Sequence, residues 1–283
     1  MGMKGFKGFE KDFSCGGKQC EENTTYEEYG EGCCYKGVMH FYEDPWEVLN
    51  HYDLVDGNGN LSEFAEVEAL GQVWNDGEKR ATNKIHVGAK LGLKGFLKAC
   101  IDFTLEKTNG TNLSGNSAQI GSSGDSAQIG SSGNYAQIGS SGNYAQIGSS
   151  GDSAKIGSSG YYAQIGSSGY SAQIGSSGNY AQIGSSGDSA QIGSSGDSAQ
   201  IGSSGNYAQI NSTGEDAVIM CAGRKSKAKG KKGSWITLAE WVKDEEKGRY
   251  VPICVKTERV DGEKIKEDTY YTLKNGEFSE VEE

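Results

Sequence analysis

The chain has 283 residues, of which 44 are Gly and only 2 are Pro, and 35% of its residues are hydrophobic. The frequent Gly excludes a helix bundle, because each Gly inside a helix costs about 1 kcal/mol, and the absence of a three-residue Gly period excludes collagen. The formal net charge of -11 predicts an acidic surface that disfavours nucleic acid, and no apolar run reaches the roughly 18 residues of a membrane-spanning helix.

Residues 1–110 are predicted to form an α+β domain. Asp44 followed by Pro45 is a signal for the start of a helix, and short apolar runs with alternation indicate strands. The expected strands are Met3–Phe9, Gly37–Tyr42, Phe64–Val73 and Asn83–Ala89, and the expected helices are Asp44–Asn50 and Leu93–Lys107.

The cysteines of this region are expected to be free thiols. Their spacing matches no strong zinc pattern, although His40 could serve as a further ligand; the residues are Cys15, Cys20, Cys33 and Cys34. The chain has 7 Cys, an odd number, and residues 1–13 lack the apolar stretch of a secretory signal. We therefore expect a cytoplasmic location.

Residues 53–63 lack the end ligands of a calcium-binding loop, so they predict a turn, and we expect no metal and no cofactor.

One catalytic arrangement can be drawn in this region. His40 and Tyr42 lie two residues apart on a predicted strand, and Glu66 lies on another. This outline resembles the sites of ADP-ribosyl transferases, in which His and Tyr position the nicotinamide nucleotide and a Glu stabilises the charged ribose. A structural role is the alternative that we favour, because many strands carry a His two residues from a Tyr.

Residues 111–220 contain a nine-residue repeat of the form [SY]-A-Q-I-G-S-S-G-[DNY]. Ile recurs at every ninth position from Ile120 to Ile219, and Ala stands two residues before each Ile. In an extended chain these two residues share one face and Gln points to the other. The two Gly residues can supply the positive φ that a tight corner requires. Because a flexible linker has no need of this register, the repeat predicts a β-solenoid.

Nine residues are too few to enclose a core, so we expect two repeats, about 18 residues, in each coil and about six coils in all. A three-sided coil of about 27 residues is the alternative. Nonapeptide repeats that bind calcium carry Asp in each turn, whereas the turn position here varies among Asp, Asn and Tyr. Calcium is therefore not expected.

The tyrosines and one lysine of the repeats are the candidate binding residues. Two repeats per coil make residues a full coil apart vertical neighbours, which places three tyrosines on one ladder. In mid-solenoid Lys155 replaces Gln and two further tyrosines occupy turn positions. The patch reflects either repeat drift with favourable stacking or an aromatic surface for a partner or a second copy. Its residues are Tyr144, Lys155, Tyr161, Tyr162, Tyr170 and Tyr180.

Residues 221–283 are predicted to form a small antiparallel β domain, and the segments flanking the solenoid can close its ends. The expected strands are Gly233–Trp241, Tyr250–Lys256 and Thr269–Leu273, with turns at Asp261-Gly262 and Asn275-Gly276. The basic segment Arg224–Lys232 either binds phosphate groups or forms a solvated loop. Nucleic acid is not expected as a partner except through this segment.

Several motifs outside the regular repeats occur together in this chain: Lys4-Gly-Phe-Lys7-Gly-Phe9, Gly37–Tyr52, Ala65–Gly71, Gly233–Trp241 and Tyr271–Phe278. With the A-Q-I-G-S-S-G repeats between them, the layout resembles a family of unknown function from bacteriophage and prophage genomes. The resemblance implies expression in the cytoplasm of a bacterial host cell, and it carries over no catalytic residues.

We expect a non-enzymatic protein that binds a host or phage protein complex, and the phage setting suggests an inhibitor of a host defence or nucleic-acid-processing complex. Self-association through the solenoid stays open, and no membrane contact is expected. Two other functions stay open: an ADP-ribosyl-transferase-like enzyme in residues 1–110, and a structural spacer or virion component.

Overall fold

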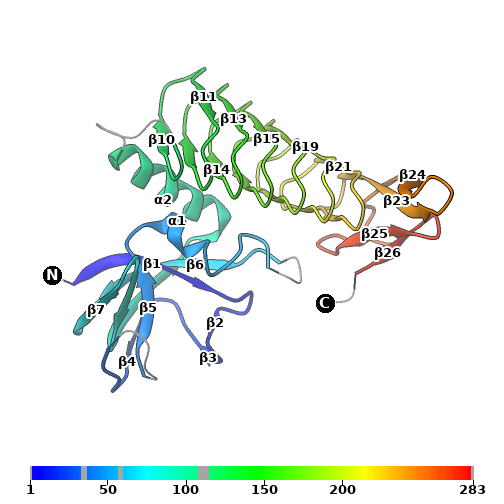
Figure 1. The fold of residues 1–283 in the computed structure, drawn as a ribbon. Helices are drawn as coiled ribbons and strands as arrows, with labels where there is room; N and C mark the ends of the chain where they lie inside the picture. The colour runs from blue at the N-terminus through cyan, green and yellow to red at the C-terminus, as the bar shows by residue number, and fades with distance from the viewer. Residues whose placement is uncertain (1, 33–36, 57–59, 108–114, 282–283) are drawn as a thin grey trace.

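The computed structural model describes residues 2–32, 37–56, 60–107 and 115–281. The protein is mainly β: an N-terminal sheet lies beside a long β-solenoid, and antiparallel strands follow at the far end of the solenoid (Figure 1). This architecture confirms the predicted fold class. Within the described ranges, no helix is long and apolar enough to cross a membrane.

The N-terminal sheet has seven antiparallel strands in the order β4-β9-β6-β1-β5-β8-β7. Its strands are β1 (Met3–Phe9), β4 (Thr24–Glu27), β5 (Met39–Tyr42), β6 (Glu63–Ala69), β7 (Val73–Asp76), β8 (Lys79–Thr82) and β9 (Lys84–Lys90), and β2 (Ser14–Cys15) and β3 (Lys18–Gln19) form a separate ribbon. The strand predicted over Phe64–Val73 ends at Ala69, because the Leu70 and Gly71 amides both donate to the Lys84 carbonyl where the chain turns.

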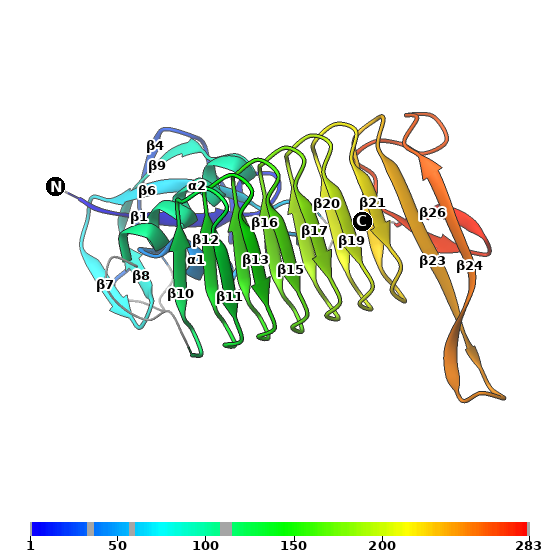
Figure 2. The same cartoon turned by 90° about the horizontal axis from the view of Figure 1, so that it is seen from above.

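Two helices join this sheet to the solenoid. Helix α1 (Pro45–Val48) is shorter than predicted but begins where expected, since the Asp44 carboxylate accepts the Trp46 backbone N–H at 2.8 Å. Helix α2 (Gly92–Lys107) is apolar on two sides. One side packs on the sheet, where the Phe96 and Phe64 rings stack with centroids 3.7 Å apart. The other side faces the solenoid, so α2 is the layer between the two units (Figures 1 and 2).

The solenoid has two repeats in each coil, as predicted. Residues eighteen apart pair in parallel register, for example Ile138 with Ile156 and Ile147 with Ile165, which excludes the three-sided coil. The sheet that faces α2, here the covered sheet, contains β10 (Gln119–Ser122), β12 (Gln137–Ser140), β14 (Lys155–Ser158), β16 (Gln173–Ser176), β18 (Gln191–Ser194) and β20 (Gln209–Ser212). The opposite sheet, here the open sheet, contains β11 (Gln128–Ser131), β13 (Gln146–Ser149), β15 (Gln164–Ser167), β17 (Gln182–Ser185), β19 (Gln200–Ser203) and β21 (Val218–Cys221).

The repeat glycines do not play the predicted role at the corners. The positive φ falls on the residue before Ala, as in Tyr162 (55°) and Ser171 (53°). The second Gly of the repeat is required by stacking instead, because a Cβ on Gly169 would lie 2.0 Å from the carbonyl oxygen of Gly151 in the preceding coil. The first Gly points out of its sheet, and a Cβ on Gly166 would meet no atom within 4 Å.

The stacking continues beyond the recognisable repeats. Strand β22 (Lys227–Lys229) pairs in parallel with β20, and Ala228 takes the place of an inward Ile. The solvated loop considered for Arg224–Lys232 is therefore wrong for this strand, because Ser226 and Ala228 keep the buried positions of the repeat. Strand β23 (Trp235–Asp244) pairs in parallel with β21, so the coils extend to Leu238.

Antiparallel strands close this end of the solenoid. Strand β24 (Arg249–Arg259) pairs with β23, and a hairpin of β25 (Tyr271–Lys274) and β26 (Glu277–Glu280) adds to β22. The hairpin turns at Asn275-Gly276 as predicted, with positive φ at both residues. Asp261 and Gly262 lie in a turn after β24, in which the Asp261 carboxylate accepts the Glu263, Lys264 and Ile265 backbone N–H groups, and they do not join two paired strands. The N-terminal unit lies along one face of the solenoid (Figure 1).

Candidate functional site

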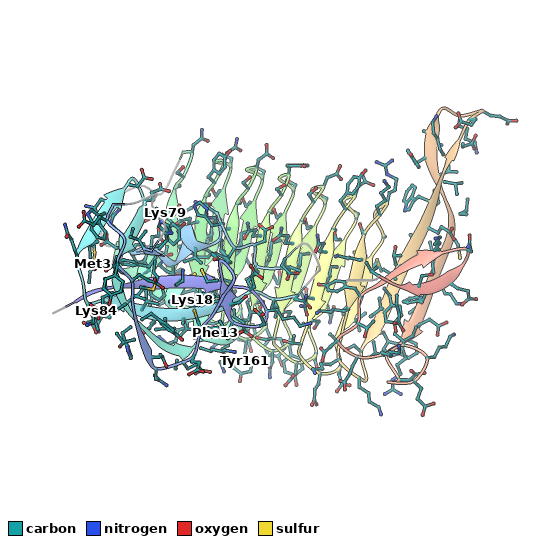
Figure 3. All side chains as sticks on the ribbon, turned by 90° about the horizontal axis from the view of Figure 1, so that it is seen from below. Met3, Phe13, Lys18, Lys79, Lys84 and Tyr161 are labelled. Atoms are coloured by element: carbon teal, nitrogen blue, oxygen red, sulfur yellow. The ribbon has the colours of Figure 1, made fainter. Side chains whose placement is uncertain are left out.

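The tyrosine ladder, defined as Tyr144, Tyr162 and Tyr180, runs along one edge of the solenoid as predicted. Successive rings are nearly parallel, with centroids 5.3 and 4.9 Å apart. The three residues are 57, 45 and 47% exposed. Tyr161 lies at the same edge and is also exposed (Figure 3). The edge therefore presents a continuous aromatic surface to solvent.

The backbone under the ladder does not favour tyrosine. Tyr144, Tyr162 and Tyr180 have φ of 56°, 55° and 59°, a left-handed conformation that costs an ordinary L-residue about 1–2 kcal/mol. In other coils Ser126 and Ser198 occupy the same position. Stacking returns about 0.5–1.5 kcal/mol for each ring pair. Tyr and Ser thus share the left-handed backbone at this corner, and ring stacking offsets part of its cost for the three tyrosines.

Tyr170 lies on the opposite edge, so its predicted place in the same patch is wrong. The chain turns from β14 to β15 at Tyr161 and Tyr162, and from β15 to β16 at Tyr170 and Ser171. Nine residues make half of a coil, and two residues nine apart therefore occupy opposite corners. Tyr170 is 57% exposed and stands apart from the ladder.

Lys155 does not belong to the aromatic patch either. It lies on the covered sheet, is 6% exposed, and its Nζ donates to the Trp46 carbonyl and to Asn50 Oδ1, each at 2.7 Å. On the same strand, the Trp46 indole packs over Gly157, where an added Cβ would lie 3.2 Å from the ring. The one lysine of the repeats therefore joins the solenoid to the α1 segment, defined here as residues 44–50.

Three glutamines in the same column as Lys155 also donate to the α1 segment. The pairs are Gln119 with Asp44 (3.4 Å), Gln137 with Glu47 (3.1 Å) and Gln173 with the Leu49 carbonyl (3.4 Å). The repeat pattern does not distinguish these three glutamines, because Gln is the same on both sheets and its partners lie outside the repeats. The only signal was the Gln-to-Lys change at Lys155.

This junction contains a polar cavity of about 550 Å³ with several carboxyl groups. Burial raises the pKa of Asp44 to about 6. The pKa of Glu47 is also raised, mainly by burial and to a smaller extent by a hydrogen bond with Glu78. Burial lowers the pKa of Lys155, while Glu47 and Asp44 oppose that shift. The perturbed groups hold the two units together through the contacts above.

The three residues of the ADP-ribosyl transferase outline line different places. His40 lines a cavity of about 260 Å³ with Lys7 and Cys20, and Glu66 lines another of about 440 Å³. Tyr42 is buried, stacks on His51 with centroids 5.3 Å apart, and has a pKa that burial raises to about 12. Neither of these two cavities is lined by all three side chains, and strand pairing places Tyr42 and Glu66 both opposite Phe6.

The basic side chains near β22 are held against the C-terminal strands. The Arg224 guanidinium lies 4.0 Å from the Tyr250 ring centroid. Lys227 and Lys229 lie 4.9 and 4.8 Å from the Tyr270 ring. These contacts compete with the phosphate binding that the charge run suggested.

The thiols of Cys15 and Cys20 are free, and Cys20 is buried. Cys33 and Cys34 lie outside the described residues, so the structure gives no view of the zinc alternative there. In the ranges that the structure describes, no group of three or more His, Cys, Asp or Glu could hold a metal ion.

Comparison with known proteins adds one match. No curated protein and no solved structure matches the chain. Residues 3–99 match the model of a domain of unknown function (DUF7666), which spans the N-terminal sheet and the first half of α2. The N-terminal unit of this chain therefore carries a DUF7666 domain.

Proposed function

We propose that this is a non-enzymatic protein-binding protein whose contact surface is the tyrosine ladder. The observation that carries the proposal is the exposed stack of Tyr144, Tyr162 and Tyr180 on left-handed backbone. Tyrosine supplies a large contact area and loses little conformational entropy on binding, which is why it is enriched at interface hot spots. The stacked solenoid holds the rings in a fixed row, so a partner meets a preorganised surface.

The partner that we propose is a host protein complex in a bacterial cell. The resemblance to phage and prophage proteins supports this setting, and it favours a complex of host defence or nucleic-acid processing as the target. The acidic overall charge of -11 would steer the protein toward a basic surface. Basic surfaces are usual on complexes that bind nucleic acid.

The test is affinity capture from infected bacterial cells with three forms of the tagged chain. Tyr162→Asn removes the central ring of the ladder. Tyr135→Asn is the matched control, because Tyr135 is 61% exposed and has the same left-handed backbone on the opposite edge. We expect one host protein to be retained by the wild type and the control and lost from Tyr162→Asn. Equal recovery by all three forms, or recovery of the chain in purified virions without a host partner, would contradict the proposal.

A further inference from the structure

The open sheet carries a groove built from the same repeat positions that α2 covers on the covered sheet. Its floor is a column of outward glycines that ends at Met220, and a column of exposed glutamines borders it. The groove has a volume of about 980 Å³. Cβ atoms built on Gly148, Gly166 and Gly184 would meet no atom of the described chain within 4 Å.

The covered groove shows what such a floor accommodates. On that sheet, Ile101 packs over Gly139, Leu97 over Gly175, and Leu93 is among the side chains over Gly193. These three α2 residues are four apart, which is about 6 Å along a helix, and successive coils are about 4.8 Å apart. Three side chains spaced by about one helical turn thus reach across the four coils from Gly139 to Gly193, with Trp46 over the intervening Gly157. The missing Cβ atoms admit these side chains.

Each coil consists of two repeats of the same nine-residue pattern, one on each sheet. The open sheet therefore repeats the glycine floor that α2 covers on the other sheet. The glutamine column that holds the α1 segment on the covered sheet is matched by Gln146, Gln164 and Gln182, all exposed on the open sheet. These side chains can donate to carbonyl or carboxylate groups beside a bound helix.

The far end of the open groove is apolar in a way that the repeat does not require. Val218 and Met220 replace Gln and Gly, and Trp235 follows Val218 in the next coil. They are 51, 52 and 48% exposed. At the corresponding place on the covered sheet, Asn211 replaces Gly. Clustered exposed apolar side chains of this size mark contact surfaces.

We propose that the open groove binds an amphipathic α-helix of a partner protein that carries Leu or Ile at every fourth position. Helix α2 of a second copy is not available, because it is packed between its own sheet and its own covered groove. The groove lies on a sheet face and the tyrosine ladder lies on an edge, so this inference does not depend on the proposed function.

A peptide with the sequence of residues 92–107 is the probe, with Gly95→Ala to raise its helicity and a fluorescent label. Titration with the full chain should raise the anisotropy of the label in a saturable way. In the full chain, Gly166→Leu together with Gly184→Leu fills the groove and should weaken binding at least tenfold. Gly130→Leu, at the other end of the floor, should weaken it less, and Tyr162→Asn should leave it unchanged.

Three outcomes would overturn the proposal. One is the absence of saturable binding at chain concentrations of about 1 mM, which corresponds to only about 4 kcal/mol. Another is binding that persists in the filled variant, since the peptide would then have entered the covered groove. The third is concentration-dependent dimerisation of the wild type that the filled variant abolishes, since the occupant would then be a second copy. Circular dichroism checks that the filled variant keeps its fold.

Discussion

Lys155 Nζ donates a hydrogen bond of 2.7 Å to the carbonyl oxygen of Trp46, and this contact joins the middle of the solenoid to the N-terminal unit. The two residues are 109 positions apart in the chain. Trp46 also packs on Gly157, two residues after Lys155. Polar and apolar contacts thus fix the same coil against the same short helix, which sets the register between the two units.

Replacing Lys155 by the repeat residue Gln should loosen this junction. Lys155→Gln shortens the side chain and leaves the buried Trp46 carbonyl and Asn50 amide with weaker partners, which should lower the free energy of unfolding by about 1–3 kcal/mol. Urea denaturation measures the change. Hydrogen exchange should quicken at residues 46–52 and stay unchanged in β19 and β21. Gln164→Ala, at the same position of an exposed strand, is the control, and an equal loss in both variants would contradict this assignment.

The two glycines of one repeat should respond in opposite ways to the same substitution. Gly169→Ala places a Cβ 2.0 Å from the Gly151 carbonyl oxygen, so the coils must separate locally, at a cost of about 1–3 kcal/mol or more. A Cβ on Gly166 meets no atom within 4 Å, and Ala restricts the unfolded chain more than Gly does. Gly166→Ala should therefore raise the free energy of unfolding by a few tenths of a kcal/mol up to about 1 kcal/mol. Thermal unfolding of the two variants compares them directly, and similar melting temperatures would refute the coil geometry.

The ladder variant Tyr162→Asn should separate binding from stability. Asn tolerates left-handed backbone, so the variant gains about 1 kcal/mol there and loses about 0.5–1.5 kcal/mol for each of two ring pairs. The net change in the free energy of unfolding should stay within about 2 kcal/mol. Circular dichroism melting curves check this, and a chain that fails to fold would mean that the ladder is needed for the fold itself.

Stability should depend on pH through Asp44. Its folded-state pKa is raised from 3.8 to about 6 by burial, so the folded chain binds the proton more tightly than the unfolded chain. The contribution is fully present below about pH 4 and is lost as the pH rises through about 6. Glu47 and Glu78 face the same cavity with Lys155, and Glu47 acts in the same direction.

Asp44→Asn is the variant that isolates this effect, because an Asn oxygen can still accept the Trp46 N–H at the helix start. The difference in unfolding free energy between the wild type and Asp44→Asn should shift in favour of the variant between pH 4 and pH 7. Because both forms contain the other carboxyl groups, the difference removes their contribution to the pH dependence, including that of groups with a lowered pKa such as Asp261. A difference that is flat with pH would show that Asp44 titrates normally in the folded chain.

The solenoid could be predicted because every repeat carries the same period. Ile at nine-residue intervals determines the inward face, and a nine-residue repeat is long enough for only half of a coil. The same half-coil spacing places Tyr170 on the edge opposite Tyr161, which the prediction of one shared patch did not take into account. The charge of Arg224–Lys232 conceals its repeat pattern, because Ser226 and Ala228 still keep the inward positions.

The junction could not be predicted from the repeats. Two equal sheets offer α2 the same glycine floor, and local sequence does not decide which of them it covers. The choice depends on contacts such as Lys155 with Trp46, which join distant segments. The left-handed residue at each corner was also missed, because Gly tolerates positive φ best, whereas here stacking keeps Gly at the neighbouring position.

The most direct test of the central claim is site-specific photo-crosslinking in infected bacterial cells. A photoreactive phenylalanine analogue is placed at position 162 on the ladder or at position 135 on the opposite edge, both of which are exposed corners with the same backbone. We expect one host protein to be attached covalently through position 162 and not through position 135. Attachment of the same proteins through both positions, or of none through position 162, would contradict the ladder as the binding surface.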